Sequence, residues 1–207
     1  PHNLNEALQL KNKFSKALWV AGSTSKDTNA LLDDQSQARE VISLYNIKEL
    51  QRIHRSERFI ELGAVASLND IIKTGKNILP SIFLEALKTI GNHEIRHFAT
   101  LGGNLGPRKK RMTSFPVLAL LESKIEVRDH HSSHWKDLTP LIQENGEMDI
   151  NPTALISRIR IPFESWNLNG FKRIRFPDRG NSLVFTVLGK IENNILEDFR
   201  FIFWQIK

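Results

Sequence analysis

The sequence predicts an α+β fold, because stretches with helical periodicity and stretches with strand alternation follow one another along the chain. The clearest helical stretch has apolar residues three and four positions apart, at Ile82, Phe83, Ala86, Leu87 and Ile90. Gly91 is placed to end this helix, as glycine often does just beyond a helix C-terminus. Strand alternation is strongest near the end of the chain, at 171–176, 183–191 and 199–206.

Local signals place the other elements. A helix is expected over 4–14, capped by Asn3 or Asn5. A second should start at Ser67, which forms a capping box with Asp70, and end at Gly75. A short third helix is expected over 115–121. Apolar runs and alternation predict strands at 17–21, 41–44, 52–54, 59–62 and 157–162, and a hairpin over 125–135.

The composition is that of an ordinary globular protein. The 207 residues are 40% apolar and 25% charged, enough to bury a real core. Cysteine is absent, which excludes disulfides, cysteinyl iron–sulfur ligation and a cysteine-linked flavin within this chain. No apolar run approaches the roughly 20 residues that span a membrane, and no secretory signal is visible, so we expect a cytoplasmic protein. The missing initiator Met indicates a trimmed or partial chain.

The net charge of +6 is concentrated in two basic clusters, at 108–111 and at Lys172, Arg173, Arg175 and Arg179. Such clusters suit nucleic acid, a dinucleotide or an acidic partner subunit, and equally a solvated surface that keeps the protein soluble. Aromatic residues are not interleaved with these charges, which disfavours a single-stranded nucleic-acid interface.

Two small-residue turns carry the chemistry that an anion needs. Gly22, Ser23 and Thr24 follow a predicted strand and combine backbone amides with two hydroxyls. The second turn, TLGGN at 100–104, combines a Thr hydroxyl, an Asn amide and paired glycines, which permit close approach or positive φ. Either turn suits a phosphate, and locally each is also explained as a plain tight turn.

Three histidines, His130, His131 and His134, lie at the predicted hairpin turn. No carboxylate or cysteine pattern completes a ligand set around them, so we favour a turn over a metal site.

Five blocks in order resemble one family. IRHFATLGGN at 95–104 is similar to the I-R-N-x-x-T-x-G-G-N signature of the FAD-binding subunit or domain of molybdenum hydroxylases, the xanthine dehydrogenase and carbon monoxide dehydrogenase type enzymes. WVAGST at 19–24 resembles the family's first flavin loop, A-G-G-T or G-N-T. The other blocks are IELGA at 60–64, PVLALL at 116–121 and ISRIRIP at 156–162.

The resemblance implies a two-subdomain FAD-binding fold of the vanillyl-alcohol-oxidase-like type. It places an FAD-binding domain at 1–162, with subdomains of about 1–52 and 53–162, and the start of a small C-terminal α+β domain at 163–207. It implies a subunit that passes electrons from iron–sulfur clusters through FAD to NAD or another acceptor. Its partners would be an iron–sulfur subunit and a molybdopterin subunit.

Carried over by position, the resemblance assigns cofactor binding to two loops and one following residue. The first loop comprises Val20, Ala21, Gly22, Ser23, Thr24 and Ser25. The second comprises Ala99, Thr100, Gly102, Gly103 and Asn104, and Thr113 follows it. No residue is assigned to acid–base catalysis or to a metal.

The chain departs from the family at three places. Ser23 replaces the second Gly of A-G-G-T, and GPRKKRMT at 106–113 replaces the A-S-P-x-x-D motif, so the family's flavin-holding Asp becomes Thr113. A further family Asp falls at about Asn181. A divergent branch of flavin subunits also lacks the Ala-Ser-Pro pattern, and this chain resembles it most. We therefore expect weak, salt-sensitive FAD binding. The alternatives are a structural subunit that has lost FAD and, less favoured, a basic nucleic-acid-binding module.

Overall fold

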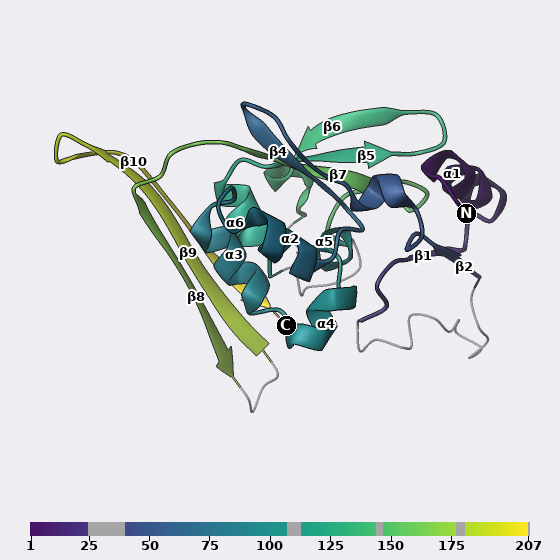
Figure 1. Ribbon diagram of the computed structural model, residues 1–207, viewed down its shortest axis with the longest axis horizontal. Coiled ribbons are helices and arrows are strands. Elements are labelled where there is room, and N and C mark those ends of the chain that lie inside the picture. The colour runs from purple at the N-terminus through teal and green to yellow at the C-terminus, as the bar shows by residue number, and fades with distance from the viewer. Residues whose placement is uncertain (25–39, 107–112, 144–146, 177–180, 207) are drawn as a thin grey trace.

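The computed structural model describes residues 1–24, 40–106, 113–143, 147–176 and 181–206 (Figure 1). Its centre is a five-stranded antiparallel sheet with strand order β3-β4-β7-β5-β6. The strands are β3 (Ile53–Arg55), β4 (Phe59–Gly63), β7 (Leu155–Pro162), β5 (Lys124–Arg128) and β6 (Ser133–Asp137). The strands predicted at 52–54, 59–62 and 157–162 and the predicted hairpin are confirmed, with ends shifted by one or two residues.

One face of this sheet is covered by short helices, which Figure 1 shows between it and the second large sheet. The helices are α2 (Leu68–Gly75), α3 (Ser81–Lys88), α4 (His93–Phe98), α5 (Leu101–Leu105) and α6 (Phe115–Leu120). Ile159 and Ile161 of β7 lie in the resulting core with Phe83 and Leu87 of α3, all fully buried. The helix expected after Ser67 is confirmed, and the Ser67 side chain accepts a hydrogen bond from the Asp70 amide.

The N-terminal segment forms a smaller layer with its own apolar cluster. Helix α1 (Leu4–Lys13) is capped by Asn3, as predicted, and packs over a two-stranded parallel sheet of β1 (Leu18–Val20) and β2 (Val41–Ser43). A 3-10 helix, η2 (Lys48–Gln51), leads into β3. The cluster's buried members include Leu4, Ala7, Ile47 and Leu50.

Three long antiparallel strands end the chain: β8 (Leu168–Phe176), β9 (Asn181–Glu192) and β10 (Ile195–Ile206), in the order β10-β9-β8. The inner face packs on the helices, where the rings of Phe115 and Trp204 lie 4.7 Å apart. The outer face exposes Phe185, Phe199, Phe201 and Phe203. The three predicted strands are confirmed, and the domain boundary at residue 163 stays a prediction.

The composition of 166–170, Trp-Asn-Leu-Asn-Gly, predicts a linker. This prediction is wrong, because β8 already begins at Leu168, which pairs with Gly189. The reason is a side-chain clamp: the Asn167 amide group exchanges two hydrogen bonds with the backbone of Ile191, at 2.6 and 2.8 Å, and so brings the chain into the ladder.

Candidate functional site

The two small-residue turns, far apart in the sequence, touch in the structure. A Cβ built on Gly22 would lie 1.7 Å from the carbonyl oxygen of Phe98 and 3.3 Å from the amide nitrogen of Ala99. Phe98 ends α4 and Ala99 leads into the second turn. Only a residue without a side chain fits this contact, so Gly22 fixes how closely the two turns approach each other.

The first turn leaves β1 and presents free donors. Val20 and Ala21 are half-buried, and Ser23 is exposed with φ +51°. Left-handed φ is costly for a residue with a Cβ, so Ser23 is held in a strained conformation. Within the described residues, the amides of Gly22, Ser23 and Thr24 donate to no protein acceptor. Ser25 lies outside the described residues.

The second turn differs from the prediction. The Gly-Gly-Asn segment was expected to be a tight turn whose paired glycines permit close approach or positive φ, but it forms the body of helix α5, capped by Thr100. Of the two expectations for the glycines, the structure bears out close approach, at Gly102. Its first four amides are already bonded within the chain. The amide of Leu101 donates to Ala66 O at 3.3 Å and that of Gly102 to Ala64 O at 2.8 Å, while those of Gly103 and Asn104 donate to Thr100 Oγ1 at 3.1 Å and Thr100 O at 3.0 Å.

The two glycines have different roles, and only Gly102 serves close packing. A Cβ on Gly102 would lie 2.7 Å from the Cβ of Ala64, so this glycine seats α5 against the chain just after β4. A Cβ on Gly103 would meet only the Thr100 hydroxyl, at 2.8 Å, and Gly103 is exposed on the outer side of α5. Gly103 thus leaves room for a ligand at the helix N-terminus, where partial positive charge favours an anion.

Asn104 has a structural task that the sequence did not reveal. Its Oδ1 accepts hydrogen bonds from the amide of Ser114 at 3.1 Å and from the hydroxyl of Ser114 at 2.6 Å. This ties α5 to the start of α6. The neighbouring Thr113, placed at the family's Asp position, is buried at 3% exposure. The predicted basic cluster at 108–111 lies outside the described residues.

Arg96 sets the direction of α4, and sequence reasoning missed its role. Gly91 has φ +56° just after α3, where a glycine was expected to end that helix. From α4, the Nη1 of Arg96 reaches back to the carbonyl oxygens of Lys88, Ile90 and Gly91, at 3.1, 3.2 and 2.9 Å. These bonds hold α4 against the end of α3, and hence position the Phe98 carbonyl that meets Gly22.

The opposite face of the five-stranded sheet carries a charged ladder. Arg158 bridges Glu61 and Glu126 with N–O distances of 2.8 Å to each. Burial alone would raise the pKa of Glu126, but hydrogen bonds from Arg158, Ser157 and Ser133 outweigh it and lower the pKa to about 2. This ladder stabilises the sheet and lies on the face away from the helices.

The predicted hairpin turn contains His130 and His131, whose rings are 5.0 Å apart. In the described part of the chain, no three His, Cys, Asp or Glu side chains are placed to hold a metal ion.

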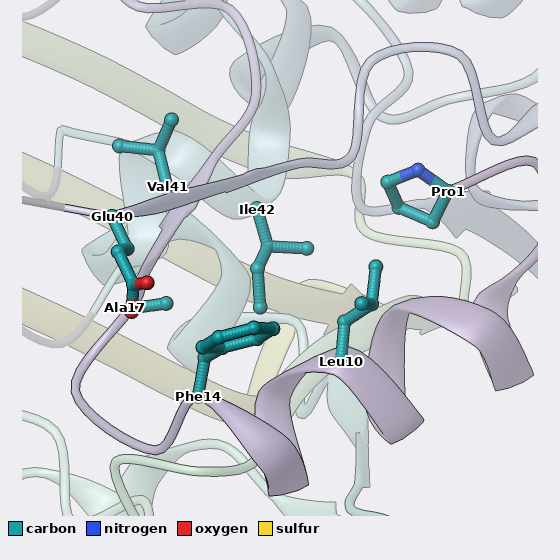
Figure 2. A pocket seen from close by; sticks show the side chains of 7 residues that line it. All are labelled: Pro1, Leu10, Phe14, Ala17, Glu40, Val41 and Ile42. Carbon is teal, nitrogen blue, oxygen red and sulfur yellow. The ribbon is translucent and has the colours of Figure 1, made fainter.

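A hollow of about 300 Å³ lies elsewhere, between α1 and β2 (Figure 2). Leu10 of α1 and Phe14, which caps the C-terminal end of α1, face Ile42 across it. Pro1, Ala17, Glu40 and Val41 complete its lining. Among the described residues that line it, Glu40 has the one charged side chain, a carboxylate that disfavours a phosphate. We therefore place the candidate site at the two touching turns.

The donor set at these turns fits a pyrophosphate. It consists of the free backbone amides of the first turn and the hydroxyls of Ser23 and Thr24, with the N-terminal end of α5 beside them, where the buried Thr100 hydroxyl caps the helix. None of the turn residues described has a carboxylate that would repel an anion.

Comparison with known proteins identifies the family. The family described as "FAD binding domain in molybdopterin dehydrogenase" matches residues 1–164, and FAD is the cofactor of these domains. YgfM of Escherichia coli K12 is 25% identical over 126 residues, which cover 60% of this chain and 46% of YgfM. Aldehyde oxidase 4 of Mus musculus is 26% identical over 175 residues, 79% of this chain and 13% of that enzyme. The chain thus matches less than half the length of either relative.

Solved structures share the fold. Quinoline 2-oxidoreductase from Pseudomonas putida 86 superposes with a TM-score of 0.85 at 17% identity, over 99% of this chain and 72% of that one. Carbon monoxide dehydrogenase from Hydrogenophaga pseudoflava gives 0.84 at 17% identity, with the same coverage. These matches confirm the predicted α+β, FAD-binding type of fold. With most of its length matched by the family, the chain belongs to the FAD-binding domains of molybdopterin dehydrogenases.

Proposed function

We propose that this chain is the electron-transfer flavoprotein subunit of an oxidoreductase of the xanthine dehydrogenase type, passing electrons from iron–sulfur clusters to NAD or another acceptor. The observation that carries the proposal is the contact of Gly22 with the end of α4, because it joins the two turns into one donor set. FAD supplies the redox chemistry when bound, and the protein supplies position and electrostatics.

In this proposal, each turn has a different task. The free amides of Gly22, Ser23 and Thr24 hold the pyrophosphate directly. The second turn contributes the partial positive charge at the N-terminal end of α5, where the buried Thr100 hydroxyl caps the helix, and the open space above Gly103. Ala21, Ala99 and Gly102 shape the backbone around the ligand, and Asn104 holds α5 in place through Ser114.

The side chains of both turns are consistent with an electron-transfer role rather than with acid–base catalysis. Over 20–24 and 99–104 they are aliphatic side chains, glycines, hydroxyls and one amide. None of these groups changes its protonation near neutral pH, so none is suited to general acid or base catalysis.

The absence of cysteine supports an iron–sulfur partner, and membership of the family supports a molybdopterin partner. The sequence has no cysteine, so iron–sulfur clusters need another polypeptide or segment. We propose an iron–sulfur subunit and a molybdopterin subunit as partners, in a cytoplasmic complex. In the described residues no helix is long and apolar enough to cross a membrane.

The absorption spectrum of the purified chain tests the proposal. A flavin band near ~450 nm, with FAD identified by mass spectrometry after release, is the expected result. A folded chain that stays colourless after incubation with excess FAD would instead establish the structural-subunit alternative. Repeating the titration at low and high salt tests the expected salt sensitivity, because exposed charges are screened within about 8–10 Å at moderate ionic strength.

A further inference from the structure

Three arginines from two separate elements converge on the C-terminal end of α3. Arg96 of α4 donates to the carbonyls of Lys88, Ile90 and Gly91. From β8, Arg173 Nη1 and Arg175 Nη2 both donate to the carbonyl oxygen of Thr89, at 3.0 and 2.8 Å. Two guanidinium groups thus share one oxygen atom, and a third binds the carbonyls on either side of it.

In the part of the chain that the structure describes, this cluster has no acidic partner. Among the described residues, no carboxylate forms an ion pair with Arg96, Arg173 or Arg175. The carbonyl end of a helix carries only about half an elementary negative charge, so most of the three positive charges remains uncompensated. One arginine would be enough to bind the carbonyl groups at the end of a helix, so helix capping does not explain why three are present.

The cluster also has donors to spare. Arg96 uses one terminal nitrogen, and Arg175 likewise uses one. The Nε of Arg173 is buried without a hydrogen-bond partner. Burial, followed by the neighbouring charge of Arg175, lowers the pKa of Arg173, which is the effect expected of a cation held beside another without an anion.

We propose that Arg96, Arg173 and Arg175 form a binding site for a phosphate group of a small molecule, separate from the two flavin turns. Guanidinium groups bind phosphate through paired, charge-assisted hydrogen bonds. Arg96 lies in the last turn of α4, two residues before Phe98, whose carbonyl meets Gly22, but its guanidinium reaches back along the helix to the end of α3.

Calorimetric titration of the FAD-saturated protein with inorganic pyrophosphate tests the site. Wild type should bind, and Arg175→Gln should weaken binding at least about tenfold, because one charge-assisted hydrogen bond and one cation are lost. Arg175 is exposed, so this variant should retain its melting temperature. Arg175→Lys keeps the positive charge but loses the planar guanidinium that donates paired hydrogen bonds, so it should weaken binding less.

Arg58→Gln is the matched control, since it removes the same charge from the exposed β3–β4 turn. It should bind as wild type does. No binding by wild type, or equal binding by wild type and Arg175→Gln, would overturn the proposal. So would binding that is present without FAD and lost at FAD saturation, because that phosphate would be occupying the flavin turns.

Two further ligands identify the source of the phosphate. Displacement of pyrophosphate by NAD or ADP would indicate a nucleotide, whereas displacement by orthophosphate alone would indicate a free anion. If the chain does not bind FAD, the same titration on the FAD-free protein still tests the arginines, so failure of the proposed function and failure of this site are distinguishable.

Discussion

Replacing Gly22 with alanine adds a single methyl group and should push the two turns apart. The new Cβ would stand 1.7 Å from the oxygen and 2.6 Å from the carbon of the Phe98 carbonyl. Both are backbone atoms, so no side chain can rotate away. The first turn and the end of α4 must therefore move apart by more than about 1 Å before the contact becomes tolerable.

The energetic effect has two parts. Overpacking of this kind costs roughly 1–3 kcal/mol of folding free energy. A displacement of about 1 Å also moves the backbone donors of the first turn out of hydrogen-bonding distance of the ligand. Losing two neutral hydrogen bonds, at about 0.5–1.5 kcal/mol each, corresponds to a roughly 5- to 150-fold weaker affinity for FAD.

Titration of the apo-protein with FAD, followed by flavin fluorescence and paired with thermal denaturation, measures both parts. Gly106→Ala is the matched control, because its Cβ would find ordinary contacts at 3.4 and 3.5 Å, with the carbonyl oxygens of Gly103 and Gly102. The control should bind FAD normally. Wild-type affinity and stability in Gly22→Ala would refute the reasoning, since the contact would then not set the spacing of the turns.

Four other outcomes are expected. Gly103→Val should fold but fail to gain the ~450 nm flavin band, because its side chain fills the exposed space above α5; normal FAD content would remove the second turn from the site. Ser23→Gly should raise the melting temperature, with up to about 1 kcal/mol gained, because the strain of φ +51° is relieved; a large destabilisation would contradict this. The pKa of Glu126 is lowered to about 2 in the folded protein, so its ionised carboxylate contributes up to about 3 kcal/mol to the free energy of unfolding. This contribution should be lost as pH falls from about 4.5 towards 2, and Glu126→Gln should remove this part of the acid sensitivity of unfolding. In denaturant unfolding, Leu188→Ala should cost about 2–5 kcal/mol, whereas Phe201→Ala, on the outer face at 61% exposure, should cost under about 1 kcal/mol; a larger cost for Phe201→Ala than for Leu188→Ala would mean that the sheet packs through its other face.

Local chemistry made much of the fold predictable. Asn3 and Ser67 cap their helices because each side chain reaches an amide three residues ahead, within one turn of the same chain. The β3–β4 and β5–β6 hairpins follow likewise, since alternation and a short turn determine which strands pair. The positions of both small-residue turns were also predicted, from their composition and from the resemblance to the family.

The conformation and contacts of those turns depended on distant residues. The Gly102–Gly103 pair is locally a turn, yet it forms a helix because Ala64, at the end of β4, accepts the Gly102 amide and leaves no space for a side chain. Gly22 meets Phe98 through backbone atoms, and a carbonyl oxygen has no sequence signature.

The sequence by itself therefore determined which segments form helices and strands and which residues cap them, because both depend on neighbours along the chain. The order of the sequence blocks also determined to which family the chain is similar. Only the tertiary structure decided that the free donors belong to the first turn and that three arginines meet at the end of α3. The physical reason is that hydrogen-bond acceptors for backbone amides and guanidinium groups are mostly backbone carbonyls, whose positions are set by packing.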